Sequence, residues 1–175
     1  TCPQYLLLTE ECYTREDGLK YIMSPPLRTQ EDCDALWEGL ADGSIQVVAT
    51  DHCPCNYGKE KQMGKDDFTA CPNGAPGVEE RLMLLYSEGV AKGRITMHRL
   101  VETLCTKPCR IYGLYPEKGA IQPGADADLV ILDPETSSVL THSRMHGAVD
   151  YTSYEGMEIQ GEIRLVMQRG NVLVK

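Results

Sequence analysis

The sequence lacks the features that mark membrane-spanning, secreted and sequence-blind nucleic-acid-binding proteins. It has no run of about 18 apolar residues, the length that a bilayer-spanning helix requires. It does not begin with an initiator Met, and its first residues lack the basic segment followed by an apolar segment that marks a signal peptide. Basic residues are few, 17 Lys and Arg against 26 Asp and Glu, for a formal net charge of -9. This balance argues against a protein that binds phosphates through a basic surface, so we expect neither nucleic acid nor a membrane among its partners.

Common catalytic signatures are missing as well. The sequence contains no Gly-x-Gly-x-x-Gly, no Walker A loop and no Gly-x-Ser-x-Gly elbow, which disfavours nucleotide binding and serine-hydrolase chemistry. No internal repeat or low-complexity tract is visible.

The eight cysteines include no Cys-x-x-Cys pair. A disulfide framework is typical of small secreted domains, whereas this chain is longer and has no secretory signal. The pairs Cys53-x-Cys55 and Cys105-x-x-x-Cys109 do not have the spacing of a zinc knuckle. We therefore expect reduced thiols that pack as small apolar groups, with Cys33 and Cys105 on apolar helix faces, and a cytoplasmic protein.

The first part of the chain alternates between strand-like and helix-like segments. Residues 21–23 and 45–50 read as strands, the second one buried because it has almost no polar side chains. Between them lies a helix that Thr29 caps, with Asp32 three residues on and Gly43 at its end. Its expected apolar face consists of Cys33, Leu36, Trp37 and Leu40. A polar stretch from residue 52 to 77 follows, and loops of this length tend to be functional.

Two more helices are expected before the character of the chain changes. One covers residues 78–91, with Val78, Leu82, Leu85 and Val90 facing inward, and the other runs from Thr96 as its cap to Pro108, which stops or kinks it. Strands alternating with helices indicate βα units and a parallel sheet. After Gly113, glycines separate short β-rich pieces, among them 128–132, 163–166 and a hairpin turning at 170–171. We therefore predict two domains, residues 1–112 and 113–175.

Asp51 and His52 follow directly on the strand expected at 45–50. In parallel α/β proteins, chemistry collects where strands end and loops converge, and a carboxylate there could bind a divalent metal or accept a proton. An Asp in this place is also a common helix cap or turn residue, and both interpretations stay open. His52 is a weaker candidate ligand. His98, His142 and His146 have no metal-ligand spacing with Asp51 and are expected to be structural.

Two further segments could present polar backbone to a ligand. In residues 23–26 the prolines remove donors and fix a turn, which leaves Ser24 free to face a ligand, and residues 72–77 form a rigid turn that contains Asn73. Either segment could equally be only a turn.

Taken together, the motifs resemble those of the hydantoinase/dihydropyrimidinase family of cyclic amidohydrolases over essentially the whole chain. The matching segments are Thr1–Leu6, Ser24–Arg28, Thr50–Pro54, Pro72–Glu79, Lys118–Ile121 and Gly124–Val130. The last of these is widespread among amidohydrolases, whereas the combination of Ser-Pro-Pro-Leu-Arg, Asp-His-Cys-Pro and Pro-Asn-Gly is much narrower.

The resemblance implies an α/β fold: a TIM-like (β/α)8 metal-dependent hydrolase barrel and a small β-sandwich built from both chain ends. Residues 1–112 would be the last barrel units and residues 113–175 the C-terminal share of the sandwich. Such enzymes hydrolyse the ring amide of hydantoins or dihydropyrimidines, usually with two zinc ions bridged by a carbamylated lysine and a hydroxide. They tend to be homotetramers, and their partners are small cyclic amides or ureides.

By position, the resemblance makes Asp51 a ligand of one metal and the general base, and makes Ser24 and Asn73 main-chain partners of the imide-like edge of the ring. The family's His-x-His pair, its lysine and its two later histidine ligands have no counterpart here, and Cys55 stands where relatives often carry an aromatic residue. We therefore expect a fragment of a longer protein that by itself is inactive and binds few or no metal ions.

Three other functions stay open. Allantoinases and dihydroorotases share the metal machinery but bind other rings, and a dihydroorotase needs a cationic group for the substrate carboxylate. Lys59, Lys61 and Lys65 keep that option open. The third is a non-catalytic dihydropyrimidinase-like scaffold protein, which the presence of Asp51 disfavours.

Overall fold

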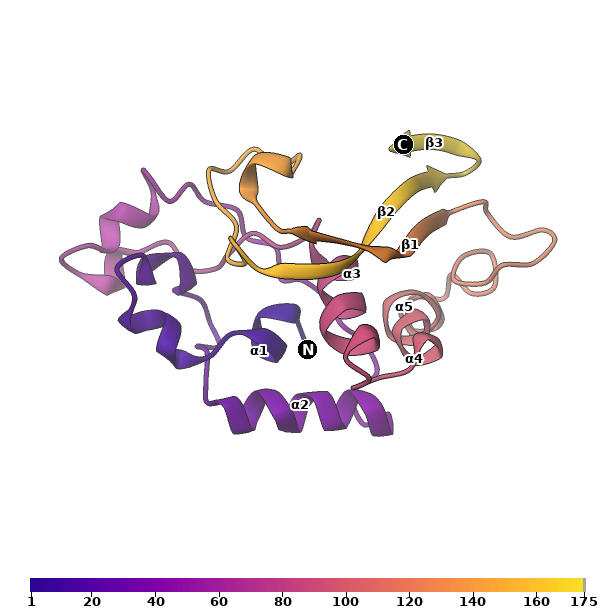
Figure 1. Ribbon diagram of the computed structural model, residues 1–175, viewed down its shortest axis with the longest axis horizontal. Coiled ribbons are helices and arrows are strands. Elements are labelled where there is room, and N and C mark those ends of the chain that lie inside the picture. The colour runs from indigo at the N-terminus through magenta and orange to yellow at the C-terminus, as the bar shows by residue number, and fades with distance from the viewer. Residues whose placement is uncertain (175) are drawn as a thin grey trace. The chain divides into compact units, whose positions relative to one another are not determined.

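Helices and strands are both present in residues 1–174, the part of the chain that a computed structural model describes (Figure 1). The α-helices are α1 Pro3–Leu7, α2 Gln30–Asp42, α3 Arg81–Leu85, α4 Met97–Val101 and α5 Lys107–Ile111. Single turns of 3₁₀-helix are η1 Glu10–Thr14, η2 Gly18–Tyr21, η3 Lys61–Gly64, η4 Phe68–Ala70 and η7 His142–Arg144. Two turns are π-helical, η5 Tyr86–Ala91 and η6 Glu102–Thr106. At this level the predicted α/β class is confirmed.

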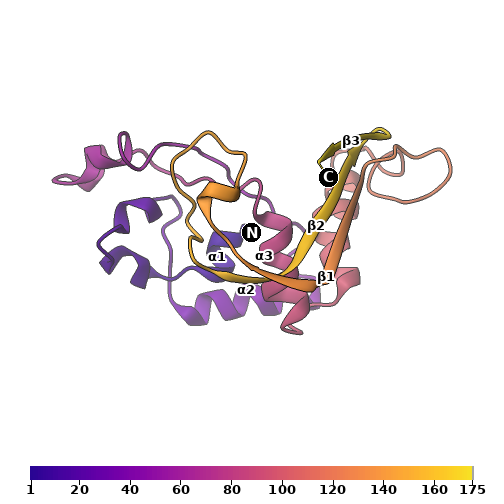
Figure 2. The ribbon, with the colours of Figure 1, turned by 45° about the horizontal axis from the view of Figure 1, so that its top comes forward.

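The strands form one three-stranded sheet in the order β1 Leu129–Val139, β2 Glu158–Gln168, β3 Asn171–Val174. β1 and β2 run side by side along their length, also when the view is turned (Figure 2). β2 and β3 are antiparallel, and their turn consists of Arg169 and Gly170, both with positive φ (47° and 80°). The hairpin prediction is confirmed, but its turn lies one residue earlier than expected, because a two-residue turn of this hand needs positive φ at both positions.

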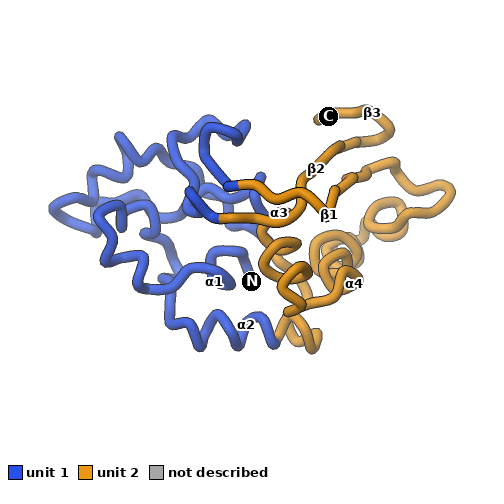
Figure 3. The backbone as a smooth tube through the Cα atoms, in the orientation of Figure 1, with its two compact units in different colours: residues 1–38, 49–81, 139–157 blue, residues 39–48, 82–138, 158–175 orange. Residues whose placement is uncertain are grey.

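The chain divides into two compact units that interleave in the sequence (Figure 3). Unit 1 consists of residues 1–38, 49–81 and 139–157, and unit 2 of residues 39–48, 82–138 and 158–175. The boundary between residues 112 and 113 that the sequence suggests stays a prediction.

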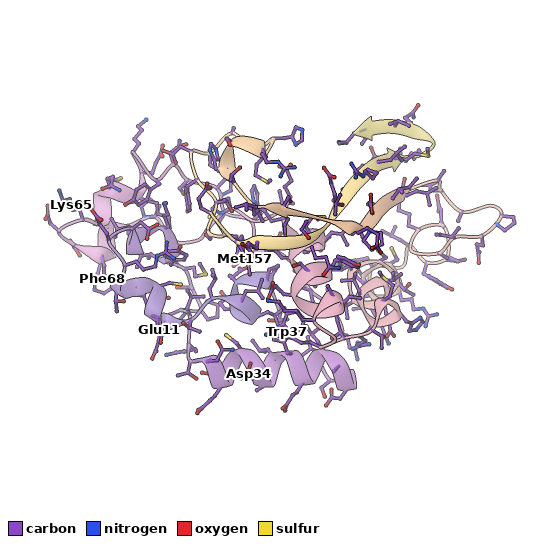
Figure 4. All side chains as sticks on the ribbon, in the orientation of Figure 1. Glu11, Asp34, Trp37, Lys65, Phe68 and Met157 are labelled. Atoms are coloured by element: carbon purple, nitrogen blue, oxygen red, sulfur yellow. The ribbon has the colours of Figure 1, made fainter. Side chains whose placement is uncertain are left out.

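Helix α2 follows the sequence signals closely. The Thr29 hydroxyl accepts a hydrogen bond from Asp32 N (3.4 Å), and the Asp32 carboxylate accepts one from Thr29 N (3.1 Å), which is a reciprocal capping box. Trp37 lies on the side of α2 toward α1, where its indole Nε1 donates to Leu6 O (3.0 Å; Figure 4). Cys33, Trp37 and Leu40 are buried as expected, and Leu36, the fourth residue of the predicted face, is half-buried. Gly43, with φ of 97°, follows the helix end.

The strands expected at residues 21–23 and 45–50 are not formed. Tyr21 ends the 3₁₀-helix η2, and in the second segment only Val48 is buried. The amides of that segment bond to partners outside a strand ladder, Val48 N to Thr103 O (3.4 Å) and Ala49 N to Thr1 O (2.8 Å). A strand is defined by continuous pairing with a neighbour, which this segment lacks within the described residues.

Two helix predictions need correction. The helix expected from residue 78 begins at Arg81, and Val78 is 58% exposed instead of facing inward, because its amide and that of Gly77 are held in a turn by a side chain. Thr96 caps α4 as expected, its hydroxyl accepting from Arg99 N (3.1 Å). Of the two effects expected of Pro108, a stop or a kink, the stop is wrong. The π-turn η6 runs directly into α5, and the proline falls in the first turn of α5, where a missing N–H is tolerated.

The eight cysteines are free thiols. Cys33 is buried in the face of α2, but Cys105 is exposed, since it lies in a π-turn, which changes the face that a side chain occupies. In the described residues, no helix combines the length and the apolar character that crossing a membrane requires.

Candidate active site

Asp51 belongs to unit 1 and has an unusual backbone conformation. Its φ is 49°, a left-handed conformation that non-glycine residues seldom adopt and that Asp tolerates better than most. Directly after it, His52 forms a parallel bridge with Ala75, and Cys53 N donates to Ala75 O (3.0 Å). The carboxylate is exposed and accepts no hydrogen bond within residues 1–174. Within the described residues, this carboxylate therefore caps no helix or turn.

Helix α1 contributes to the surroundings of Asp51 through Gln4 and Tyr5. The buried side chain of Gln4 donates through Nε2 to the carbonyl of Thr50 (3.2 Å), the residue before Asp51. Tyr5 donates its hydroxyl proton to Pro25 O (3.0 Å), next to Ser24. Burial, and then the negative charges of Cys2 and Asp51, raise the pKa of Tyr5 to about 12. Tyr5 therefore joins the Ser24 turn to the surroundings of the Asp51 carboxylate.

The imidazole of His52 binds two main-chain amides. Its Nδ1 accepts hydrogen bonds from Gly77 N (3.2 Å) and Val78 N (3.3 Å). With Nδ1 used as an acceptor of amide hydrogens, the ring proton belongs on Nε2. His52 thus orients the start of the segment that leads to α3, and its Nδ1 is not available to a metal ion.

Ser24 and Asn73, the two predicted substrate-binding residues, line the same cavity, which has a volume of about 490 Å³. Its other lining residues are Tyr13, Ile22, Met23, Pro26, Phe68, Thr69 and Cys71. The walls are therefore mainly apolar, with a few polar groups, as is typical of sites for small organic ligands. Phe68 and Lys65 lie at the outer end of the loop between residues 52 and 77 (Figure 4), and Phe68 is 70% exposed although it lines the cavity.

The two cavity segments are tied together by main-chain contacts. Gly74 N donates to Ile22 O (2.9 Å), and the thiol of Cys53 lies 3.3 Å from Asn73 O. A side chain at position 74 would collide with Cys53, since a Cβ built there would lie 2.5 Å from the Cβ of Cys53. The segment containing Asn73 is therefore fixed on both sides, against the Ser24 turn and against the residues that follow Asp51.

A metal ion would find few ligands in this chain. No group of three or more His, Cys, Asp or Glu side chains suited to a metal occurs in residues 1–174. The histidines expected to be structural are engaged or exposed elsewhere: His146 Nδ1 pairs with Glu79 (2.7 Å), His142 Nε2 contacts Val149 O, and His98 is exposed on α4. A catalytic zinc ion needs about three protein ligands, so Asp51 alone does not fit one.

The sequence interpretation gives no role to Gln4 and Tyr5, and it considers Lys61 only as a possible cationic group for a dihydroorotase substrate. Gln4 and Tyr5 fall inside a motif that supports the family resemblance, which could have drawn attention to them. Lys61 is completely buried, whereas sequence pattern places a lysine in a polar loop on the surface. Nothing local distinguishes it from Lys59, whose side chain is 84% exposed.

Comparison with known proteins identifies relatives of this chain. The sequence profile of the amidohydrolase family matches residues 11–173. A D-phenylhydantoinase of Escherichia coli is 50% identical over 173 residues, which are 99% of this chain and 38% of that protein. The crystal structure of a dihydropyrimidinase from Brevibacillus agri superposes with a TM-score of 0.98 at 42% identity, covering 100% of this chain and 38% of the other.

An L-hydantoinase (dihydropyrimidinase) from Arthrobacter aurescens is also similar, with a TM-score of 0.93 at 36% identity over 100% of this chain and 38% of that one. The chain thus spans little more than a third of the length of these relatives.

Proposed function

The chain belongs to the amidohydrolase family, and on this premise we propose that the whole protein hydrolyses the ring amide of hydantoins or dihydropyrimidines. The observation that carries the proposal is the 50% identity to a D-phenylhydantoinase over 99% of this chain. The shared cavity of Ser24 and Asn73 supports it, since the two residues predicted to hold the ring come from separate segments and line one space.

In the proposed reaction, a water oxygen bonds to the ring carbonyl carbon, and the bond from that carbon to the ring nitrogen breaks. Asp51 accepts a proton from the attacking water and transfers it to the ring nitrogen, so that the ring opens and this nitrogen becomes the neutral carbamoyl end of the same molecule. Its exposed carboxylate, which accepts no hydrogen bond within the described residues, suits this work. The main chain at Ser24 and Asn73 would hold the imide-like edge of the ring in the apolar cavity.

The proposal includes a pair of divalent cations, zinc or a similar metal, which would polarise the ring carbonyl. Asp51 would supply one ligand. The other ligands would come from parts of the protein outside this chain, since residues 1–174 contain no group that could hold a cation alone.

The finer architecture and the setting are proposals as well. Residues 1–112 would be the last βα units of a TIM-like barrel, and residues 113–175 the C-terminal share of a β-sandwich. The whole protein would be a cytoplasmic homotetramer whose partners are small cyclic amides or ureides.

Allantoin and dihydroorotate are the rival substrates. A dihydroorotase needs a cationic group for the substrate carboxylate, and the three lysines of the loop are the candidates. Lys61 is buried and bound to main-chain carbonyls, and Lys59 lies 4.0 Å from Glu60, so two of the three have other partners. This arrangement favours a neutral ring. A non-catalytic scaffold protein is the alternative outside the enzymes.

The decisive experiment uses the full-length protein. Its metal content is measured, and its activity is assayed on hydantoin, dihydrouracil, allantoin and dihydroorotate. The proposal expects bound divalent metal and turnover of hydantoin or dihydrouracil above the other two. A metal-free, inactive protein would support the scaffold function, and preferred turnover of allantoin or dihydroorotate would assign the rival substrate.

A further inference from the structure

Lys61 is a buried cation without an acidic partner. Its side chain lies in η3 and is 0% exposed. No carboxylate within residues 1–174 comes close enough to form a salt bridge with it. Burial lowers the pKa of its ammonium group. A buried lysine is destabilising unless its donors are well used, so the position calls for a reason.

The donors of Lys61 bind the two segments that line the cavity. Its Nζ lies 2.9 Å from Ile22 O and 2.7 Å from Pro72 O. Ile22 lies two residues before Ser24, and Pro72 comes directly before Asn73. An ammonium group has three donors and no acceptor, so it can hold two carbonyls that would otherwise repel each other. Hydrogen bonds to a charged donor are also stronger than neutral ones.

Ile22 O has a second donor on the neighbouring segment, Gly74 N, at 2.9 Å. Asn73 therefore lies between Pro72, whose carbonyl accepts from Lys61, and Gly74, whose amide donates to Ile22 O. The Ile22 carbonyl oxygen and the Lys61 ammonium nitrogen therefore connect the segment of Ser24 to the segment of Asn73 and set the distance between them.

We propose that Lys61 is a positioning residue that fixes the distance between the Ser24 and Asn73 main chains, and through it the affinity for the cyclic amide. The inference rests on the proposed function, because it assigns a substrate to this cavity. Lys61 itself does not touch the substrate. It acts through the Ile22 and Pro72 carbonyls, so its loss changes binding more than the chemical step.

The test uses the full-length protein and hydantoin, with KM and kcat measured separately. Lys61→Met keeps the apolar stem and removes every donor, and we expect KM to rise about tenfold or more, about 1.4 kcal/mol of binding, while kcat changes less than about threefold. Lys61→Gln retains a shorter donor and should give a smaller rise in KM. Lys59→Met, an exposed lysine of the same loop, is the matched control and should leave both constants unchanged.

The outcomes separate the inference from the function on which it rests. A folded Lys61→Met or Lys61→Gln variant with wild-type KM, or one that loses kcat alone, overturns the positioning role while the function stands. Failure of both variants to fold assigns Lys61 to stability alone and overturns the role as well. A wild-type protein inactive on every cyclic amide removes the proposed function and the inference together.

Discussion

The imidazole Nδ1 of His52 lies 3.2 Å from the main-chain nitrogen of Gly77 and accepts its hydrogen. The amide of Val78 is bound by the same atom at 3.3 Å. A histidine directly after the candidate catalytic Asp51 could be interpreted as a metal ligand. The position of its ring is instead explained by the hydrogen bonds that it accepts from the two amides before α3. His52 links the residues after Asp51 to the segment that carries Asn73.

Replacing His52 separates these two interpretations. His52→Asn keeps an acceptor where Nδ1 was, because the amide oxygen of Asn occupies nearly the same place, whereas His52→Phe keeps the ring and removes the acceptor. We expect His52→Phe to lower the free energy of unfolding by about 1 kcal/mol, and His52→Asn to change it much less. Chemical denaturation of the full-length protein measures both. The metal content should be unchanged in each variant, and a loss of metal in both would identify His52 as a ligand.

Removal of the Asp51 carboxylate tests the assigned base. Asp51 is exposed and makes no hydrogen bond within the described residues, so Asp51→Ala should leave the fold intact. The free energy of unfolding should fall by about 1 kcal/mol, because Ala tolerates the positive φ of 49° less well than Asp. Ring opening should fall by about 10³-fold or more, because a general base alone contributes about 10²- to 10⁴-fold. The steady-state rate on hydantoin is the measurement. Asp66→Ala, an exposed carboxylate of the same loop, is the control, and near-wild-type turnover by Asp51→Ala would refute the role.

The capping box of α2 offers a test of stability that is independent of activity. Thr29→Ala removes the hydroxyl that accepts from Asp32 N and should lower the unfolding free energy by about 1 kcal/mol. Thr9 precedes η1 in the same way, but its side chain makes no capping hydrogen bond, so Thr9→Ala is a matched control. Thermal unfolding of the two variants should differ. Equal midpoints would show that the Thr29 cap contributes nothing.

Local signals in the sequence predicted local structure well. The capping box at Thr29 and Asp32 and the apolar face of α2 depend on residues within a few turns of one another, and the structure has both. The strand expected at residues 45–50 depends on neighbours far away in the chain, and those amides found other partners. Periodicity cannot foresee such choices, because an apolar run is compatible with several kinds of backbone.

The site was predictable to the extent that it follows motifs. Ser24 and Asn73 were singled out from two separate turns, and both line one cavity. Lys61 could not be found in this way, since its burial and its two carbonyl partners exist only in three dimensions. Pro108 shows that a local signal can also mislead. A proline usually ends a helix, but here the preceding residues form the π-turn η6, and Pro108 lies in the first turn of the next helix, α5.

Asp150 holds the beginning of the 52–77 loop across a long sequence separation. Its carboxylate accepts from Tyr57 N (2.5 Å) and Gly58 N (2.8 Å). Burial pushes the pKa of Asp150 upward, but the amides of Gly58 and Tyr57 outweigh it and lower the pKa below its ordinary value. The ionised carboxylate therefore binds the loop better than the protonated acid, and the loop carries both Lys61 and Asn73.

Because the folded-state pKa of Asp150 lies below the unfolded one, its contribution to stability is present above about pH 4, the unfolded value, and is lost as the pH falls through the folded value. Asp150→Asn should lower the unfolding free energy at pH 7, and the difference from wild type should shrink steadily as the solution is acidified below about pH 4. Urea unfolding of both proteins between neutral and acid pH measures this difference. If the difference in unfolding free energy between the two proteins stays constant over the whole pH range, the negative charge of Asp150 does not hold the loop. A neutral side chain would then bind the two amides equally well.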